Sequence, residues 1–272
     1  EIGSGLVGSE MCIRDSYVKC YEDAGMMEIW NTIRHDEKGG KVVLYRYASA
    51  SPILKAPSYW LTQFNGRYKR EATLEEERLG EGVKIIDSKL GIRAHQYRIP
   101  SFLVSYNHEA RENDGEVFAA SLKWPGSFQM AFDMDWNKNL RVLTGINPLG
   151  AQYYLERGGT FTTPAILWTY SKNGKGETSR QFHRWAKDYV IRDPHKDRPV
   201  LLNNWEATYF DFNEDKLVEL MGDAVKLGVD MFLLDDGWFG NKYERHSDTQ
   251  GLGDWDETPV SYTHLTLPTI LR

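Results

Sequence analysis

The sequence predicts a mixed fold, an antiparallel β-sandwich followed by one β-α-β unit. Short β-branched and aromatic runs separated by Gly, Asn and Asp clusters fill residues 17–170, without intervening helices. A helical period begins near Thr178, and a strand, helix and strand follow from Pro199. A length of 272 residues is also enough for two ordinary domains.

The clearest strand is predicted at residues 128–136, where apolar residues alternate with polar or small ones. The apolar face of this strand carries Phe128, Met130, Phe132, Met134 and Trp136. A turn at 137–139 leads into a second strand at 140–146, and Asp114-Gly115 precedes another at 116–124. A polar segment at 35–40 separates two further strands. Repeated hairpins of this kind favour a sandwich.

A helix is predicted after the sandwich because apolar residues recur there at helical spacing. Its apolar face carries Phe182, Trp185, Ala186, Tyr189 and Val190. We expect the helix to end before Pro194 and the charged segment 192–198 to link two domains.

The β-α-β unit begins with a predicted strand at 199–204. Asn213 can cap the following helix, which Gly228 ends. The apolar run 229–234 is typical of a buried parallel strand. Both barrels and open doubly wound sheets contain such units, and both place their chemistry at the carboxyl ends of the strands.

Chemically capable side chains follow both predicted strands. Trp205 follows the first strand, whereas Asp235, Asp236 and Trp238 follow the second. Adjacent carboxylates repel each other unless each meets a donor or a cation, and sugar hydroxyls are suitable donors. A Trp ring can pack on the apolar face of a pyranose while neighbouring carboxylates accept its hydroxyl hydrogens. These residues therefore outline a carbohydrate site.

Other interpretations of these residues stay open. The two carboxylates can cap a helix or end a strand, and paired Asp residues also hold Mg²⁺ in phosphoryl-transfer enzymes, although no phosphate loop accompanies them here. Both tryptophans can be core aromatics. The histidines have no partner at metal-ligand spacing, so the sequence predicts no metal site.

Bulk composition excludes several classes of protein. A content of 41% hydrophobic and 13% aromatic residues indicates a globular protein and not a disordered one. The formal net charge of -6 and the absence of Lys or Arg runs disfavour nucleic acid as a partner. No apolar stretch reaches the roughly 20 residues of a membrane helix, so we expect no membrane partner and a soluble protein.

Both ends of the chain resemble translated library-adapter sequence. We interpret residues 1–16 and 259–272 as artefactual on this basis. Cys12 then belongs to the artefact, and Cys20 alone offers neither a disulfide nor a thiolate metal cluster. The cellular compartment stays open between cytoplasm, periplasm and secretion.

The segment RPVLLNNWEATYFDFNEDKLVELMGDAVKLGVDMFLLDDGWFG, followed by LGDW, closely resembles the start of the catalytic barrel in family 36 glycoside hydrolases, the bacterial-type α-galactosidases. Shorter motifs upstream, such as FTTP and SRQFH, resemble landmarks of the N-terminal domain of that family. The resemblance implies an antiparallel β-supersandwich over 17–175, a helix and linker over 176–198, and the start of a truncated (β/α)8 barrel over 199–258.

The same resemblance implies a retaining hydrolase of terminal α-galactosides such as melibiose and raffinose, without a cofactor, that forms a homo-oligomer when intact. Asp235 and Asp236 would bind galactose hydroxyls, and Trp205 and Trp238 would line the same subsite. The nucleophile and the acid/base would lie beyond this chain, so none of its residues is predicted to be catalytic and the chain alone is predicted to be inactive. Alternatives are an α-N-acetylgalactosaminidase, a galactosyltransferase of the same family, or a non-catalytic sandwich that binds sugars or organises an oligomer.

Overall fold

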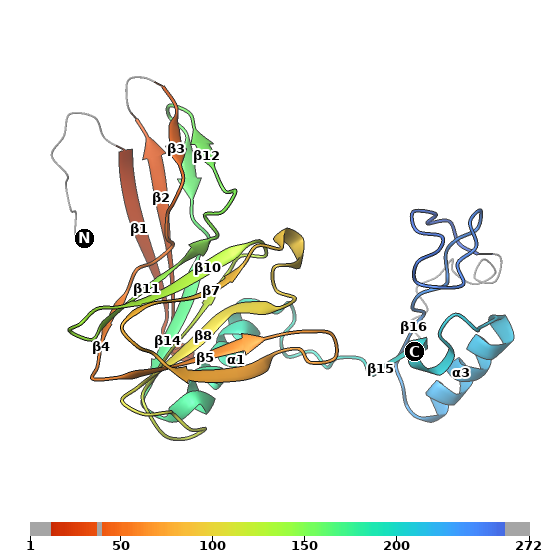
Figure 1. Cartoon of the computed structure of the whole chain (residues 1–272). Helices are drawn as coiled ribbons and strands as arrows, with labels where there is room; N and C mark the ends of the chain where they lie inside the picture. Colours follow the sequence, from red (N-terminus) through yellow and green to blue (C-terminus); the bar gives the residue numbers. More distant parts are fainter. Residues whose placement is uncertain (1–11, 37–39, 259–272) are drawn as a thin grey trace. The chain divides into compact units, whose positions relative to one another are not determined.

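The computed structural model describes residues 12–36 and 40–258 (Figure 1). The chain divides into two compact units, residues 1–194 and 195–272, which are described separately below. Most of the adapter-like ends, residues 1–11 and 259–272, lie outside the described residues. Residues 12–16, by contrast, belong to the first strand of unit 1.

Unit 1 is built from antiparallel sheets, as predicted (Figure 1). The larger sheet has the strand order β1-β2-β14-β9-β8-β5-β6, and β13 also pairs with β2. Its strands are β1 (Cys12–Tyr21), β2 (Met26–His35), β5 (Tyr59–Asn65), β6 (Thr73–Arg78), β8 (Arg98–Tyr106), β9 (Val117–Leu122), β13 (Thr160–Thr162) and β14 (Ile166–Ser171).

A second sheet has the order β4-β11-β10-β7, and a two-stranded sheet joins β3 and β12. The strands of these two sheets are β3 (Val42–Leu44), β4 (Ile53–Lys55), β7 (Gly82–Ser88), β10 (Phe128–Met134), β11 (Asn139–Ile146) and β12 (Tyr153–Leu155). Short 3-10 turns lie at Glu22–Ala24 and Gly91–Arg93.

The two large sheets share one hydrophobic core, which makes unit 1 a sandwich. Phe102 of β8 meets Phe132 of β10 edge to face, with ring centroids 4.8 Å apart, so the two sheets contact directly through aromatic rings. Tyr59 is 0% exposed, and its hydroxyl donates to the Lys138 carbonyl and accepts from the Ala56 amide. The one polar atom of this core aromatic is therefore paired.

The strand predicted at 128–136 is shorter than expected. β10 ends at Met134, and Trp136, which was predicted to lie on the buried face, is 79% exposed. The chain turns here because the Asp135 carboxylate accepts from both the backbone N–H and the side-chain amide of Asn139, at 2.8 and 2.7 Å. This local carboxylate–amide pairing ends the strand before its apolar alternation ends.

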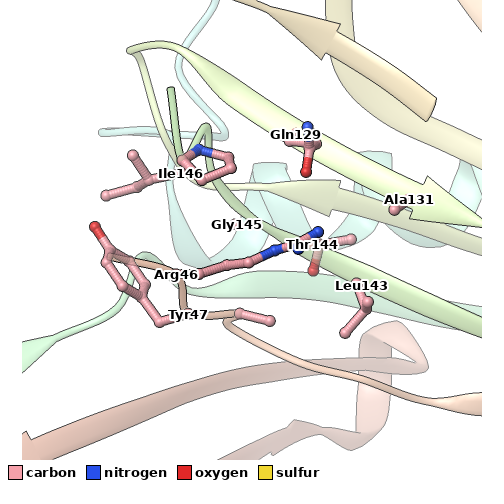
Figure 2. Close-up of a pocket in the computed structure, with 10 residues that line it drawn as sticks. Arg46, Tyr47, Gln129, Ala131, Leu143, Thr144, Gly145 and Ile146 are labelled. Carbon is pink, nitrogen blue, oxygen red and sulfur yellow. The ribbon is translucent and has the colours of Figure 1, made fainter. Parts of the chain in front are cut away.

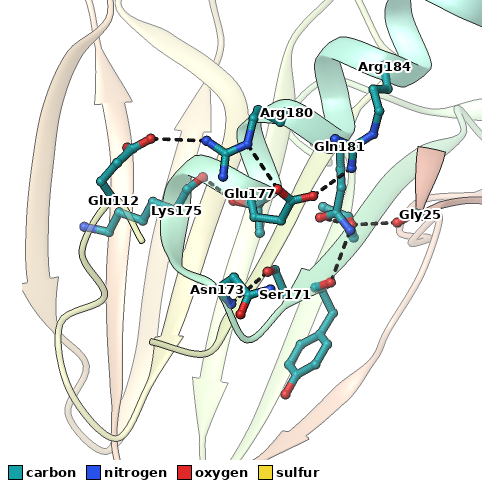
Figure 3. A network of polar contacts seen from close by, with 12 residues as sticks. Gly25, Glu112, Ser171, Asn173, Lys175, Glu177, Arg180, Gln181 and Arg184 are labelled. Carbon is teal, nitrogen blue, oxygen red and sulfur yellow. Dashed lines mark hydrogen bonds and ion pairs between the residues drawn. The ribbon is translucent and has the colours of Figure 1, made fainter. Parts of the chain in front are cut away.

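Helix α1 (Gly174–Tyr189) begins before the predicted start near Thr178 (Figure 3). Gly174 has φ +79°, and a Cβ there would lie 2.5 Å from the Asp114 N and the Arg111 carbonyl oxygen. The amides of Gly174, Lys175 and Gly176 donate to carbonyls of the segment 111–115. A tertiary contact therefore caps the helix, which no local capping signal predicts.

α1 covers one face of the larger sheet. Trp185 packs with Tyr21, Met26 and Leu167 in a second apolar cluster. At the same face, Thr169 and Gln181 form a buried side-chain hydrogen bond of 2.7 Å. The predicted apolar face is therefore confirmed only in part, since Trp185 is buried and Phe182 and Ala186 are partly buried. Tyr189 is 48% exposed, and Val190, which is 59% exposed, lies beyond the end of the helix. None of the helices in residues 12–36 and 40–258 is long and apolar enough to cross a membrane.

Unit 2 contains a parallel pair of strands, β15 (Leu201–Asn203) and β16 (Met231–Leu233). Helices α2 (Trp205–Thr208) and α3 (Glu214–Lys226) lie between them in the sequence. The Asn213 side chain accepts from the Lys216 amide at 3.0 Å, which confirms the predicted cap of α3. Gly228 follows the helix with φ +79°.

The expectation that 229–234 is buried is wrong for this chain. Met231 is 38% exposed and Leu233 is 44% exposed. A sheet with two strands in the described residues leaves the outer edge of each strand without a neighbour. Apolar side chains along this sheet therefore face solvent.

Candidate sugar site at two strand ends

Two asparagines join the carboxyl ends of β15 and β16. Asn203 Nδ2 donates to Asp235 Oδ2 at 2.6 Å, and its Oδ1 accepts from the Trp205 amide at 2.8 Å. Asn204 is 1% exposed, and its Oδ1 accepts from the Asp235 amide at 2.8 Å. The strand-end positions predicted from sequence are therefore in direct contact.

Asp235 keeps part of its accepting capacity. Its Oδ2 accepts from Asn203, and its Oδ1 accepts from the Asp236 amide at 2.7 Å. Within the described residues these are its two hydrogen bonds, and a carboxylate offers about four acceptor positions. Roughly one position on each oxygen is therefore left for a ligand.

Asp236 is held by a bidentate ion pair. Arg245 Nε donates to Oδ1 and Arg245 Nη2 donates to Oδ2, both at 2.6 Å, and the Gly237 amide also donates to Oδ1 at 2.7 Å. The hydrogen bonds from Arg245 hold the pKa of Asp236 below its usual value, although burial opposes this shift. The repulsion expected between adjacent carboxylates is therefore offset by a cation from the chain itself.

Both tryptophans pack with aromatic side chains of their own loops. The ring of Trp205 lies 5.2 Å from that of Tyr209 and 5.0 Å from that of Phe210. The ring of Trp238 lies 5.2 Å from that of Phe239. Trp205 and Trp238 are both partly exposed, so neither is a fully buried core residue.

Sequence reasoning missed Arg245. The requirement that adjacent carboxylates meet a donor or a cation was a usable signal, since Lys242 and Arg245 are the nearest cations along the loop. Spacing alone cannot choose between them. In the structure the cation that pairs with Asp236 is Arg245, whereas the backbone N–H of Lys242 donates to Asp254 at 2.7 Å.

Metal binding fits this arrangement poorly. Both oxygens of Asp236 already face a guanidinium, which occupies the position that a cation would need. In the part of the chain that the structure describes, no group of three or more His, Cys, Asp or Glu side chains is arranged to hold a metal ion.

Unit 1 also contains cavities. One of about 240 Å³ lies where Tyr47 passes Gln129 and Gly145 (Figure 2). Another of about 510 Å³ lies where the first turns of α1 meet β5, β8 and β9. None of the four predicted site residues lines either cavity.

Comparison with known proteins defines the class as glycosyl hydrolase. Residues 14–156 match the model of the glycosyl hydrolase family 36 N-terminal domain, and residues 160–266 match the melibiase model. The chain therefore belongs to glycoside hydrolase family 36. Both matches extend into the ends predicted to be adapter-like, and the artefactual origin of those ends stays a prediction.

Curated relatives agree with this assignment. The chain is 36% identical over 261 residues to alpha-galactosidase AgaA of Geobacillus stearothermophilus, covering 93% of the chain and 34% of the relative. It is 36% identical over 223 residues to alpha-galactosidase Mel36A of Lactobacillus acidophilus, covering 81% and 30%. The chain thus spans about a third of the length of these relatives.

Solved structures agree as well. The alpha-galactosidase of Lactobacillus brevis matches with a TM-score of 0.83 and 34% identity, covering 92% of this chain and 33% of that one. A raffinose complex of Geobacillus stearothermophilus AgaA matches with a TM-score of 0.82 and 32% identity, covering 89% and 33%.

Proposed function

We propose that the intact protein is a retaining α-galactosidase that hydrolyses terminal α-D-galactosides of the melibiose and raffinose type. The relatives named above are α-galactosidases, and doubly substituted variants of AgaA have been crystallised with raffinose and with stachyose. The observation that carries the proposal is the contact of Asp235 with Asn203 and Asn204 across the carboxyl ends of two parallel strands. Barrel enzymes place their substrates at such strand ends.

The second part of the proposal concerns the fold of unit 2. We take β15, α3 and β16 as the first β-α-β unit of a (β/α)8 barrel, in which every strand has a neighbour on both sides. The exposed apolar side chains of Leu201, Met231 and Leu233 support this proposal, because further strands and helices would cover them. We further propose that the intact protein is a homo-oligomer, which sedimentation velocity can test.

The residues of this chain would orient galactose rather than break the glycosidic bond. Asp235 has acceptor positions for sugar hydroxyls, and the partly exposed rings of Trp205 and Trp238 can pack on the apolar face of a pyranose. A general acid at neutral pH needs a raised pKa, whereas the pKa of Asp236 is lowered. Asp236 is therefore unsuited to the acid role, and we propose that both the nucleophile and the acid/base of a retaining mechanism are residues beyond this chain.

A comparison of the chain with the intact protein tests the proposal. The gene is extended from its source DNA, and both proteins are incubated with p-nitrophenyl α-galactoside. We expect hydrolysis by the intact protein and none by the 272-residue chain.

Anomer and substituent controls separate the alternatives. We expect the intact protein to leave the β-galactoside uncleaved and to prefer the α-galactoside over the α-N-acetylgalactosaminide. Turnover by the isolated chain, or an intact protein that prefers the N-acetylated substrate, would overturn the proposal.

A further inference from the structure

The segment 238–258 forms a closed loop whose two ends meet. The Thr258 amide donates to the Trp238 carbonyl at 2.9 Å, and the Gly240 amide donates to the Asp256 carbonyl at 3.0 Å. Phe239 and Glu257 form an antiparallel bridge between these two contacts. The loop that follows the paired carboxylates is therefore fastened at its base.

The guanidinium of Arg245 lies at the centre of this loop, with its side chain only 5% exposed. Besides its two bonds to Asp236, it donates to the carbonyls of Gln250 and Asp248. Its carbon Cζ lies 4.7 Å from the centroid of the Phe239 ring and 5.7 Å from that of Phe210. One buried cation thus connects the carboxylate, two loop carbonyls and two aromatic rings.

Glycines let the backbone close around this side chain. Gly240 has φ +98° and Gly251 has φ +60°, and a Cβ at either position would lie 3.1 or 3.2 Å from the Cβ of Arg245. A Cβ at Gly251 would also lie 2.6 Å from the Tyr243 carbonyl oxygen. The loop therefore has the backbone freedom that a centrally placed arginine requires.

We infer that Arg245 is a positioning residue for Asp236, because it fixes the orientation of that carboxylate and ties it to the closed loop 238–258. The inference rests on the proposed galactose subsite. It deepens the proposal by naming a group that acts on substrate through Asp236 and does not itself touch the sugar.

The inference gives the two carboxylates different tasks. Asp236 accepts three hydrogen bonds from Arg245 and the Gly237 amide, which leaves about one acceptor position, on Oδ2. Asp235 has about one position left on each oxygen. Asp235 is therefore the main acceptor for galactose hydroxyls, and Asp236 accepts a single one in a fixed direction.

Charge around Asp236 supports the same assignment. Arg245 faces it directly, Asp235 is its neighbour in the chain, and the Asp248 carboxylate also acts on the guanidinium. With Arg245 in place, Asp236 stays ionised beside a second carboxylate. Without this cation, the carboxylate would titrate at higher pH.

Proteolysis of the 272-residue chain tests the link between Arg245 and the loop. We compare Arg245→Met and Arg245→Lys with Lys226→Met, which removes an exposed ion pair on α3. Chymotrypsin cleavage after Tyr243 should become at least tenfold faster in Arg245→Met, change less in Arg245→Lys, and stay unchanged in Lys226→Met. Cleavage of Arg245→Met at the wild-type rate would overturn the inference.

Kinetics of the intact enzyme test the link between Arg245 and substrate. Arg245→Met should raise KM more than it lowers kcat, and the acid limb of kcat/KM should move to higher pH, with partial recovery in Arg245→Lys. A merely structural role would lower the amount of active enzyme and leave KM and the pH profile unchanged, which would contradict the inference. If the intact protein has no galactosidase activity, the proposed function fails, while the proteolysis result still decides the link between loop and carboxylate.

Discussion

The two units of this chain are stabilised in different ways. Unit 1 buries a continuous core in which Tyr59 is 0% exposed and Phe132 is 1% exposed. Within residues 195–258, the buried apolar side chains are Leu217, Ala224 and Phe239. The buried polar residues Asn204 and Arg245, whose whole-residue exposures are 1% and 8%, make the contacts that join the strand ends to their loops.

Apolar burial and specific polar contacts thus contribute differently to the stability of the two units. Burial of apolar area stabilises unit 1, whose core lies between its own sheets. The described part of unit 2 depends on polar side chains with specific partners, because much of its apolar surface faces solvent. Substitutions in the two units should therefore have effects of different kinds.

The largest effect is expected from Phe132→Ala in the core of unit 1. Removing a ring that is 1% exposed and that contacts Phe102 should cost about 3–5 kcal/mol in free energy of unfolding. Urea unfolding followed by near-UV circular dichroism measures the loss. Ile92→Ala, at a side chain that is 97% exposed, is the control and should change little. A loss of less than about 1 kcal/mol for Phe132→Ala would contradict the claim that apolar burial stabilises unit 1.

Asn204→Ala should have the next largest effect, confined to unit 2. It removes the acceptor of the partly buried Asp235 amide and the donor of a buried hydrogen bond to Thr208, losses that together cost roughly 1–3 kcal/mol. Hydrogen exchange at the Asp235 amide should accelerate, while the unfolding transition of unit 1 stays in place. The exposed Asn241→Ala is the matched control. Equal destabilisation of both units would show that they are not independent.

A smaller effect is expected from Asn213→Ala at the start of α3. The side chain accepts from the Lys216 amide, and loss of such a cap costs about 1 kcal/mol. Exchange at the Lys216 amide should become faster. Asn213→Asp keeps an acceptor at the same position and should behave like the wild type, so a large effect of Asn213→Asp would contradict the capping role.

The most local effect is a dependence on pH. The pKa of Asp236 is lowered by Arg245, so the ion pair stabilises the loop fully above the ordinary Asp pKa of about 4 and is lost as pH falls through the lowered value. The NMR shift of the Gly237 amide, which donates to Asp236, should report this titration. Asp236→Asn should abolish the response, and a response that persists would assign it to another group.

Most of the architecture could be predicted from apolar periodicity. Alternation predicted the strand at 128–136 correctly as far as Met134, and helical spacing found Trp185, which α1 buries, but also Tyr189, which is 48% exposed. Two of the errors lie where specific hydrogen bonds override the pattern. Asp135 and Asn139 close a turn that leaves Trp136 in solvent, and carbonyls of 111–115 extend α1 backwards.

Only the position of the site could be predicted, from the general rule that α/β proteins place their chemistry at the carboxyl ends of parallel strands. That rule predicted chemistry at the carboxyl ends of both strands, where the structure shows Asn203 hydrogen-bonded to Asp235. Arg245 could not be placed, because its partner lies nine residues away across an irregular loop. Its direction is set by Phe210, Phe239 and two glycines that come close only in the folded chain.

The most direct test of the proposed galactose subsite is the substitution Asp235→Asn in the intact protein. With loss of charge-assisted hydrogen bonds to one or two sugar hydroxyls, kcat/KM for p-nitrophenyl α-galactoside should fall roughly 10²- to 10⁴-fold. Asp223→Asn, on the exposed face of α3, should leave kcat/KM within a factor of two of the wild type. If Asp235→Asn retains wild-type kcat/KM, galactose is not held at these strand ends and the account is wrong.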